Sequence, residues 1–234
     1  MFPGFPPEAL TFLRSLKRNN RREWFQPRKE IFETKLKTPM VQLVEAVNAE
    51  LLDFAPDHIT DPKKAVYRIY RDTRFSADKT PYKTHVAAIF PNHDLEKHSS
   101  AGFYFHLTGK SIGIAAGSYM PGPDELRAMR AWLAQHHQDF RDAARKPEKL
   151  LGKLQGSAVT RMPKGFDAEH PAEDFIRMKQ WLYWVELDAK IATTPRLLPE
   201  LVKRFRAAAP VIAMLNAPLR KNAPKSARAT SYPS

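Results

Sequence analysis

The sequence predicts an α+β fold in which a mainly antiparallel sheet, a meander of about four to six strands, is flanked by helices from both ends of the chain. Two observations predict it. Apolar residues recur at helical spacing before residue 55 and after residue 121, whereas residues 85–119 hold short runs that alternate between apolar and polar side chains. We find no repeat and no Gly/Ser-rich linker, so residues 1–218 are expected to form one domain.

The N-terminal segment is expected to form helices separated by short breaks. Pro7 and Glu8 suit the first turn of a helix, because proline lacks the N–H that would go unpaired there and a carboxylate faces the positive end of the helix dipole. The apolar stripe that follows ends near Asn19. Beyond it we expect a helical turn over residues 21–25 and helices over 27–37 and 39–54.

The middle of the chain is rich in aromatic and β-branched residues bounded by Pro, Gly and Asn, which is typical of strands joined by short turns. We expect strands over residues 66–70, 85–90, 102–107 and 112–119, a short one over 159–162, and one over 180–187 that rejoins the sheet.

The C-terminal part is again predicted to be mostly helical. Helices are expected from 124 to 136, from 139 to 156 with a break near Pro147, from 171 to 178, and from 195 to 216 with a kink or interruption at Pro210. Residues 219–234 are basic and rich in Pro, Ala and Ser, so we expect a disordered tail.

Composition excludes several classes of function. The 234 residues include no cysteine, which excludes disulfides, thiolate catalysis and cysteine-ligated metals. No P-loop, dinucleotide-binding glycine motif or nucleophile elbow is present, and we expect no cofactor. His85, His93 and His98 lack the spacing of a metal site, so no metal is expected. Without a secretory signal or an apolar run of about 20 residues, we expect a cytoplasmic protein with no membrane span.

A cationic loop between two predicted strands is the first candidate site. Arginine and lysine side chains bind phosphate or carboxylate oxygens, and the net charge of +13 favours an anionic partner. The alternative is that these cations pair with Asp72 and Asp78 inside the loop. The candidate ligand-binding residues are Arg71, Arg74, Lys79, Tyr82, Lys83, His85 and Tyr119.

Strand alternation predicts what lies beside this loop. Tyr104 and His106 point to one face of their strand and Phe103 and Phe105 to the other. If the registers agree, Tyr104, His106 and Tyr119 line a depression on the polar face, where Gly113 and Gly117 would let a ligand or another segment approach closely. Tyr104 and His106 are the candidate acid–base pair.

Three functions remain open at this point. The first is binding of a phosphate- or carboxylate-bearing small molecule at the 71–85 loop. The second is a hydrolase or transferase that acts on a phosphorylated substrate through His106 or His85. The third is non-specific nucleic-acid binding through net charge. Trp181, Tyr183 and Trp184 could stack on bases, although an aromatic strand is more often part of the core.

Five stretches of the chain form a recognisable set, namely residues 20–25, 71–85, 102–106, 113–119 and 165–171. Together they resemble the DUF2461 family, a mainly bacterial domain of unknown function. The resemblance extends to about residue 218 and implies a single α+β domain, without implying any activity. This chain departs from the glycine-richer form of one motif, because Ala115 and Ala116 occupy its centre.

Overall fold

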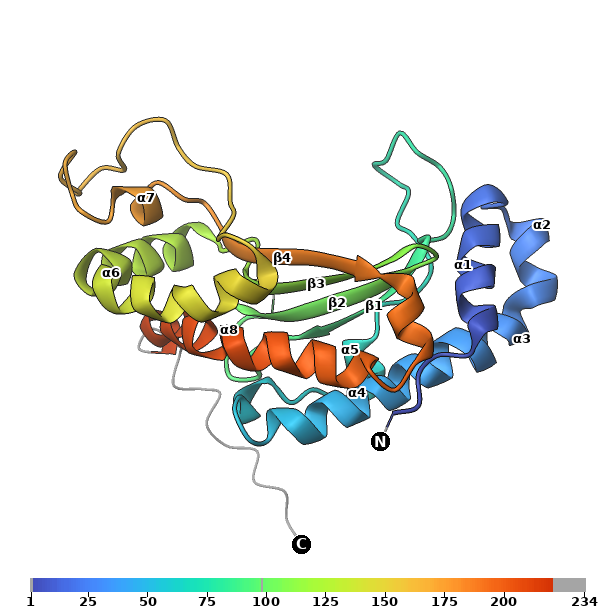
Figure 1. Ribbon diagram of the computed structural model, residues 1–234. Helices are drawn as coiled ribbons and strands as arrows, with labels where there is room; N and C mark the ends of the chain where they lie inside the picture. Colours follow the sequence, from blue (N-terminus) through green and yellow to red (C-terminus); the bar gives the residue numbers. More distant parts are fainter. Residues whose placement is uncertain (1, 98, 221–234) are drawn as a thin grey trace, which may run out of the picture.

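The computed structural model describes residues 2–97 and 99–220, and its central feature is a four-stranded antiparallel sheet (Figure 1). Neighbours in the sheet are also neighbours in sequence, so the predicted meander is confirmed and the last strand rejoins it as expected. The strands are β1 (His85–Phe90), β2 (Gly102–Thr108), β3 (Ser111–Ser118) and β4 (Trp181–Asp188).

Helices from both ends of the chain surround this sheet, which confirms the α+β class. Single turns of 3₁₀ or π geometry (Gln26–Arg28 and Glu33–Lys37) join α2, α3 and α4 into a nearly continuous helical stretch, and two further 3₁₀ turns are Pro56–His58 and Ala189–Thr193. The helices are α1 (Pro7–Arg18), α2 (Arg22–Phe25), α3 (Lys29–Phe32), α4 (Thr38–Leu51), α5 (Pro62–Ala65), α6 (Pro123–Leu151), α7 (Glu173–Ile176) and α8 (Leu197–Arg220).

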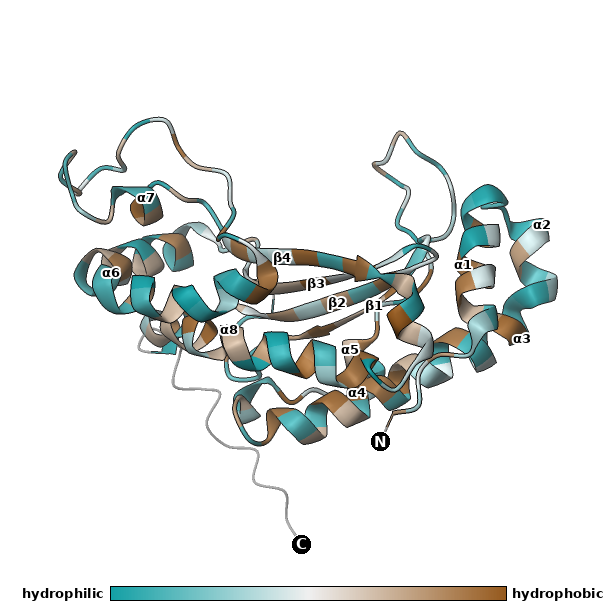
Figure 2. Cartoon of the chain, in the orientation of Figure 1, coloured by the Kyte–Doolittle hydropathy of each residue, from teal (hydrophilic) through white to brown (hydrophobic). Residues whose placement is uncertain are grey.

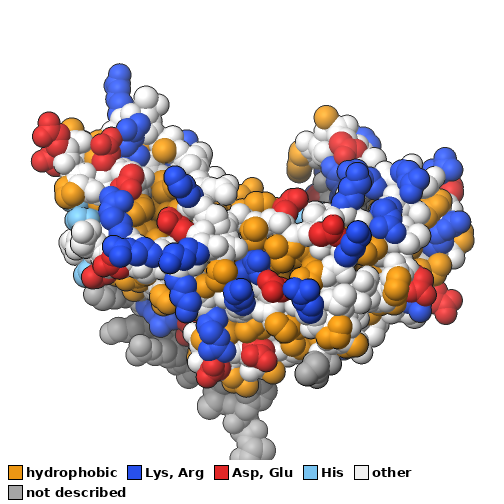
Figure 3. All heavy atoms as spheres, in the orientation of Figure 1, with side chains coloured by type: hydrophobic (Ala, Val, Ile, Leu, Met, Phe, Trp, Pro, Cys, Tyr) orange, Lys and Arg blue, Asp and Glu red, His pale blue; other side chains and the backbone are white. Residues whose placement is uncertain are grey.

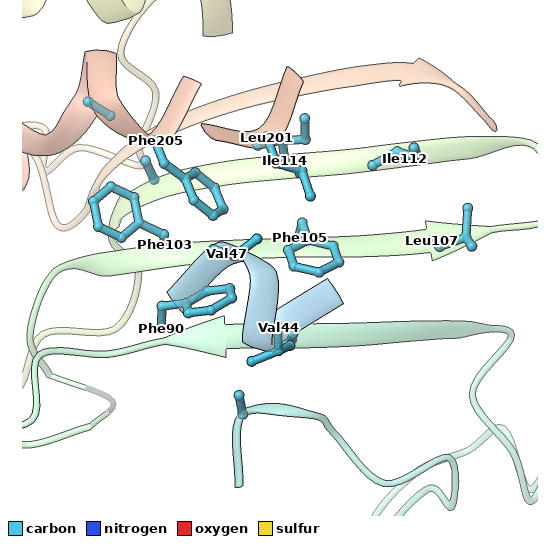
Figure 4. Packing of buried hydrophobic residues seen from close by; sticks show 14 of the residues in the cluster. Val44, Val47, Phe90, Phe103, Phe105, Leu107, Ile112, Ile114, Leu201 and Phe205 are labelled. Atoms are coloured by element: carbon cyan, nitrogen blue, oxygen red, sulfur yellow. The ribbon is translucent and has the colours of Figure 1, made fainter. Parts of the chain in front are cut away.

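One face of the sheet is the core. Helix α4 packs against β1 and α8 against β3, and α6 lies beside α8. The Phe205 ring of α8 is centred 4.9 Å from Phe103 and 5.8 Å from Phe90, so residues distant in sequence meet under the sheet (Figure 4). Hydrophobic and hydrophilic residues alternate along β2 and β4 (Figure 2), and on β2 the hydrophobic side chains are the buried ones.

Two expected strands are wrong. Residues 66–70 form isolated bridges only, because the segment divides its backbone hydrogen bonds between two partners. Tyr67 donates to Ala87 of β1, whereas Ile69 accepts from Lys83 on the return of the loop. Residues 159–162 also lack a ladder, since only Ala158 bridges to Met178.

The C-terminal helices differ from expectation at their prolines. Helix α6 departs from helical geometry at His136 (φ −121°, ψ 22°), next to the expected boundary between two helices, but it continues through Pro147, where a break was expected. Helix α8 runs through Pro210 without interruption, because the exposed proline is flanked by Ala209 and Val211, whose burial outweighs one lost hydrogen bond.

The last described helix extends beyond the expected domain boundary at residue 218. Helix α8 extends to Arg220, and the remainder of the predicted tail, residues 221–234, lies outside the described residues. Within the described ranges, no helix combines the length and the apolar character needed to cross a bilayer.

Candidate functional site

The charges of the 71–80 loop largely pair with one another. Arg71 donates to the Asp78 carboxylate at 2.5 Å and to the Thr80 hydroxyl, and Arg74 holds Asp72 with two hydrogen bonds of 2.8 and 3.1 Å. A backbone hydrogen bond from Thr80, reinforced by Arg71, lowers the pKa of Asp78 to about 2. These contacts match the alternative of internal pairing for Arg71 and Arg74.

Lys79 and Tyr82 also contact the protein itself. The Lys79 ammonium donates to the Thr73 carbonyl at 2.9 Å. Tyr82 is 1% exposed and its ring stacks on Phe25 with 4.1 Å between centroids. The Asn20 side chain donates to the Tyr82 carbonyl (2.8 Å) and accepts from its N–H (3.1 Å), so it pairs with the loop as a neighbouring strand would.

The open face of the sheet carries a cavity of about 560 Å³. The molecular surface is hollowed between a lobe formed by the 71–84 loop and a lobe that contains α7 (Figure 3). The cavity is lined by Tyr67, Lys83, His85, Ala87, Ile89, Pro91, Lys97, Ser100, Gly102, Phe103, Tyr104, His106, Ala115, Ala116, Gly117, Tyr119, Met120, Leu182 and Trp184.

The two glycines of β3 have different roles in this floor. Gly113 of β3 pairs with His106 of β2. A Cβ atom at residue 113 would lie 2.5 Å from Trp184 Cη2 and 2.6 Å from His106 Cε1. The close approach expected at Gly113 is therefore made by the protein's own rings. Gly117 lines the cavity, and its φ of +141° suits glycine.

Tyr104 and His106 are in contact as the strand pattern predicted. The Tyr104 hydroxyl lies 3.2 Å from His106 Nδ1, within hydrogen-bonding distance. The His106 ring is centred 5.1 Å from His85 and 5.4 Å from Trp184, so a row of rings crosses the sheet. This row forms one wall of the cavity.

Burial sets the protonation of these groups. It lowers the pKa of His106, and it lowers the pKa of His85 to about 4 with additional effects from His106 and Lys83. Both imidazoles are thus neutral near pH 7. Burial, together with nearby Tyr67, raises the pKa of Tyr104 to about 12, so its phenol remains protonated. Two neutral imidazoles and a phenol can accept or donate hydrogen bonds and protons here.

The charged groups that line the cavity are cationic. The Lys83 ammonium lies 4.8 Å from the centre of the Tyr67 ring. Burial lowers the pKa of Lys83, and the like charge of Arg68 lowers it further. Lys97 borders the cavity from the segment after β1, and no Asp or Glu occurs among the described lining residues. The cavity is consequently a region of positive potential.

Of the residues predicted from sequence, the structure brings Lys83, His85, Tyr104, His106 and Tyr119 together in the cavity and leaves Arg71, Arg74, Lys79 and Tyr82 outside its lining. The main additions are Tyr67, Lys97, Ser100 and Trp184. Alternation along β4 could have separated Trp184 from the buried Trp181 and Tyr183, but its place beside His106 depends on sheet register. Across residues 2–97 and 99–220, no three His, Asp or Glu side chains are grouped as metal ligands.

One comparison with known proteins gives a match. A family model described as "Conserved hypothetical protein (DUF2461)" matches residues 8–214, which is most of the chain. No curated protein matches. Two stretches that carry the resemblance, residues 20–25 and 71–85, contact each other through the pairing of Asn20 and Phe25 with Tyr82.

Proposed function

We propose that this chain, which belongs to the DUF2461 family, binds a small ligand with a phosphate or carboxylate group in the cavity on the open face of its sheet. The observation that carries the proposal is the composition of the lining. It contains Lys83, Lys97, His85 and His106, and no carboxylate among its described residues. A cavity of about 560 Å³ is of the size that holds small molecules.

We propose that the anionic group of the ligand lies at the end of the cavity lined by Lys83. Lys83 is partly buried, and the like charge of Arg68 nearby disfavours its protonated form. An anion there would remove that unfavourable interaction and gain charge-assisted hydrogen bonds. His85, next to Lys83 in the lining, offers a further donor once protonated. Arg74 is a weaker candidate, because the Nε and Nη2 edge of its guanidinium already donates two hydrogen bonds to Asp72.

A second candidate function is catalysis on a phosphorylated substrate, as a hydrolase or transferase. The contact between Tyr104 and His106 Nδ1 favours it, because such a contact orients an imidazole. In this proposal His106 is the acid–base group, with His85 beside it.

The test of binding is a thermal-shift screen of phosphorylated and carboxylated metabolites, followed by calorimetry on any ligand that raises the midpoint. We expect Lys83→Ala to weaken binding about tenfold, which corresponds to the loss of one charged hydrogen bond. The matched control is Arg74→Ala, which removes an exposed cation that is already paired and should change affinity less than about twofold.

Three outcomes separate the proposals. Equal weakening by both variants, with affinity that falls steeply with salt, would indicate non-specific polyanion binding instead. Product formation that His106→Ala abolishes would establish the enzyme. A screen in which no anionic compound stabilises the protein would contradict the binding proposal.

A further inference from the structure

The floor of the cavity is flat and made of small residues. In the register, Gly102 pairs with Gly117, and Ala115 lies between Tyr104 on one side and Trp184 on the other. Trp184 leans over Gly113 toward His106, so the space above Ala115 and Gly117 remains open and forms part of the cavity. A shallow floor bounded by aromatic side chains is suited to a planar group.

The width of this space agrees with one inserted ring. Neighbouring strands lie about 4.8 Å apart, so the backbones that carry Tyr104 and Trp184 are separated by about 10 Å. A planar ring lying flat over Ala115 fits between these two backbones, with Tyr104 and Trp184 at its edges. Tyr67, whose ring is centred 6.4 Å from that of Tyr104, extends the same wall.

A buried hydroxyl at one end of the cavity points to a polar edge on the ligand. Ser100 is 7% exposed and lines the cavity, and its Oγ has no hydrogen-bond partner among the described residues. Buried hydroxyl groups are normally paired, so a ligand atom is a natural partner for this one. Gly102 begins β2 just after Ser100, and Phe103 pairs with Phe90, so Ser100 lies near the end of β1.

The Ser100 hydroxyl and Lys83 lie toward opposite ends of β1, and Lys97 belongs to the same connecting segment as Ser100. Strand β1 starts at His85, next to Lys83, and ends at Phe90, about 17 Å away at the usual rise per residue. A ligand that reaches from Lys83 toward Ser100 is therefore elongated, with its anion at one end and a hydrogen-bonding edge at the other. The aromatic side chains lie between these ends.

From this arrangement we infer that the ligand is a phosphate ester of a planar heteroaromatic ring, that is, a nucleotide. Its ring lies over Ala115 between Tyr104 and Trp184, its polar edge bonds to Ser100, and its phosphate faces Lys83. The inference rests on the proposed binding function and adds the chemical class of the ligand. A sugar phosphate would satisfy Lys83 but would leave the ring site and Ser100 without a planar partner.

The experiment is calorimetry with AMP, UMP, adenosine, ribose phosphate and inorganic phosphate on the full chain. We expect at least one nucleotide to bind more than tenfold tighter than ribose phosphate and adenosine. Ser100→Ala should weaken that nucleotide about fivefold or more and leave ribose phosphate binding unchanged. Trp184→Leu should weaken it about tenfold.

The matched control is Trp132→Leu, which removes a half-buried tryptophan of α6 that stacks on His136 and does not line the cavity. It should leave affinity unchanged, and thermal midpoints confirm that each variant is folded. If ribose phosphate binds as tightly as the nucleotides, the nucleotide inference is overturned while the proposed anion binding stands. If none of the phosphate compounds binds and the screen of other anions also fails, both are overturned.

Discussion

The two faces of the sheet are built from the same strands and have opposite roles. Phe103 and Phe105 of β2 are buried under α4 and α8, whereas Tyr104 and His106, one position along, are half-buried on the face without helical cover. The covered face gains its stability from burial of apolar surface. The open face can keep imidazole, phenol and ammonium groups because no helix of residues 2–97 and 99–220 packs over it. Consecutive residues thus belong alternately to the core and to the candidate site.

The largest expected effect is on the covered face. Phe103→Ala should lower the free energy of unfolding by about 3–5 kcal/mol, because it leaves a cavity against Phe205. Tyr104→Phe, at the adjacent residue, should cost less than about 1.5 kcal/mol, the value of one hydrogen bond to His106. Urea unfolding measures both. Similar losses for the two variants would contradict the division of roles between the faces.

The next effect separates two glycines of the same strand. A Cβ atom at residue 117 would lie 1.9 Å from the Trp181 carbonyl oxygen at a φ of +141°, so Gly117→Ala should cost about 2–5 kcal/mol. At Gly113 the obstacles are the ends of two side chains, which can rotate away. Gly113→Ala should cost less than about 2 kcal/mol and change the near-UV circular dichroism as Trp184 moves. The prediction fails if Gly113→Ala is the more destabilising variant in urea.

A smaller effect concerns a polar atom on the covered face. The Tyr183 hydroxyl is buried and has no hydrogen-bond partner among the described residues, and burial raises its pKa. Tyr183→Phe removes an unpaired group and should leave the free energy of unfolding unchanged or raise it by up to about 1 kcal/mol. A loss of stability in chemical denaturation would show that this hydroxyl is paired in solution.

The last effect is the dependence of stability on pH that His85 contributes. Its pKa is about 4 in the folded protein and about 6.5 in an unfolded chain, so the unfolded chain takes up the proton first. Its contribution to stability is complete above pH 6.5 and is lost as the pH falls toward 4. Replacement of the imidazole in His85→Gln should therefore flatten the stability profile over that range. Urea midpoints collected from pH 4.5 to 7.5 test this, and identical slopes for the two proteins would refute it.

Much of the fold could be predicted because it depends on local patterns. Apolar and aromatic runs bounded by turn residues identified all four strands, and the separation of Tyr104 and His106 from Phe103 followed from alternation along β2. The strand predicted over residues 66–70 is wrong. Their composition indicates an extended backbone, but it does not show whether that backbone pairs with one neighbouring strand or divides its hydrogen bonds between two segments. The kink predicted at Pro210 is also wrong. The low helix propensity of proline is a local cost, and the packing of α8 on the sheet outweighs it.

The candidate site was predictable only in part. The sequence placed Lys83, His85, Tyr104, His106 and Tyr119 near one another through strand order, and these residues line one cavity. It could not assign partners to charges close together in the chain. Asp72 and Asp78 pair with Arg74 and Arg71 through the geometry of one short loop.

By itself, the sequence determined the α+β class, the meander and the polar character of one sheet face. These features follow from the spacing of apolar residues, which is a local property of the sequence. Only the tertiary structure decided which polar residues share the cavity. Trp184 comes from a strand more than 60 residues beyond β3, and Ser100 and Lys97 come from a connecting segment, so their meeting depends on register and chain path. These long-range contacts have no local signal, and they define the site.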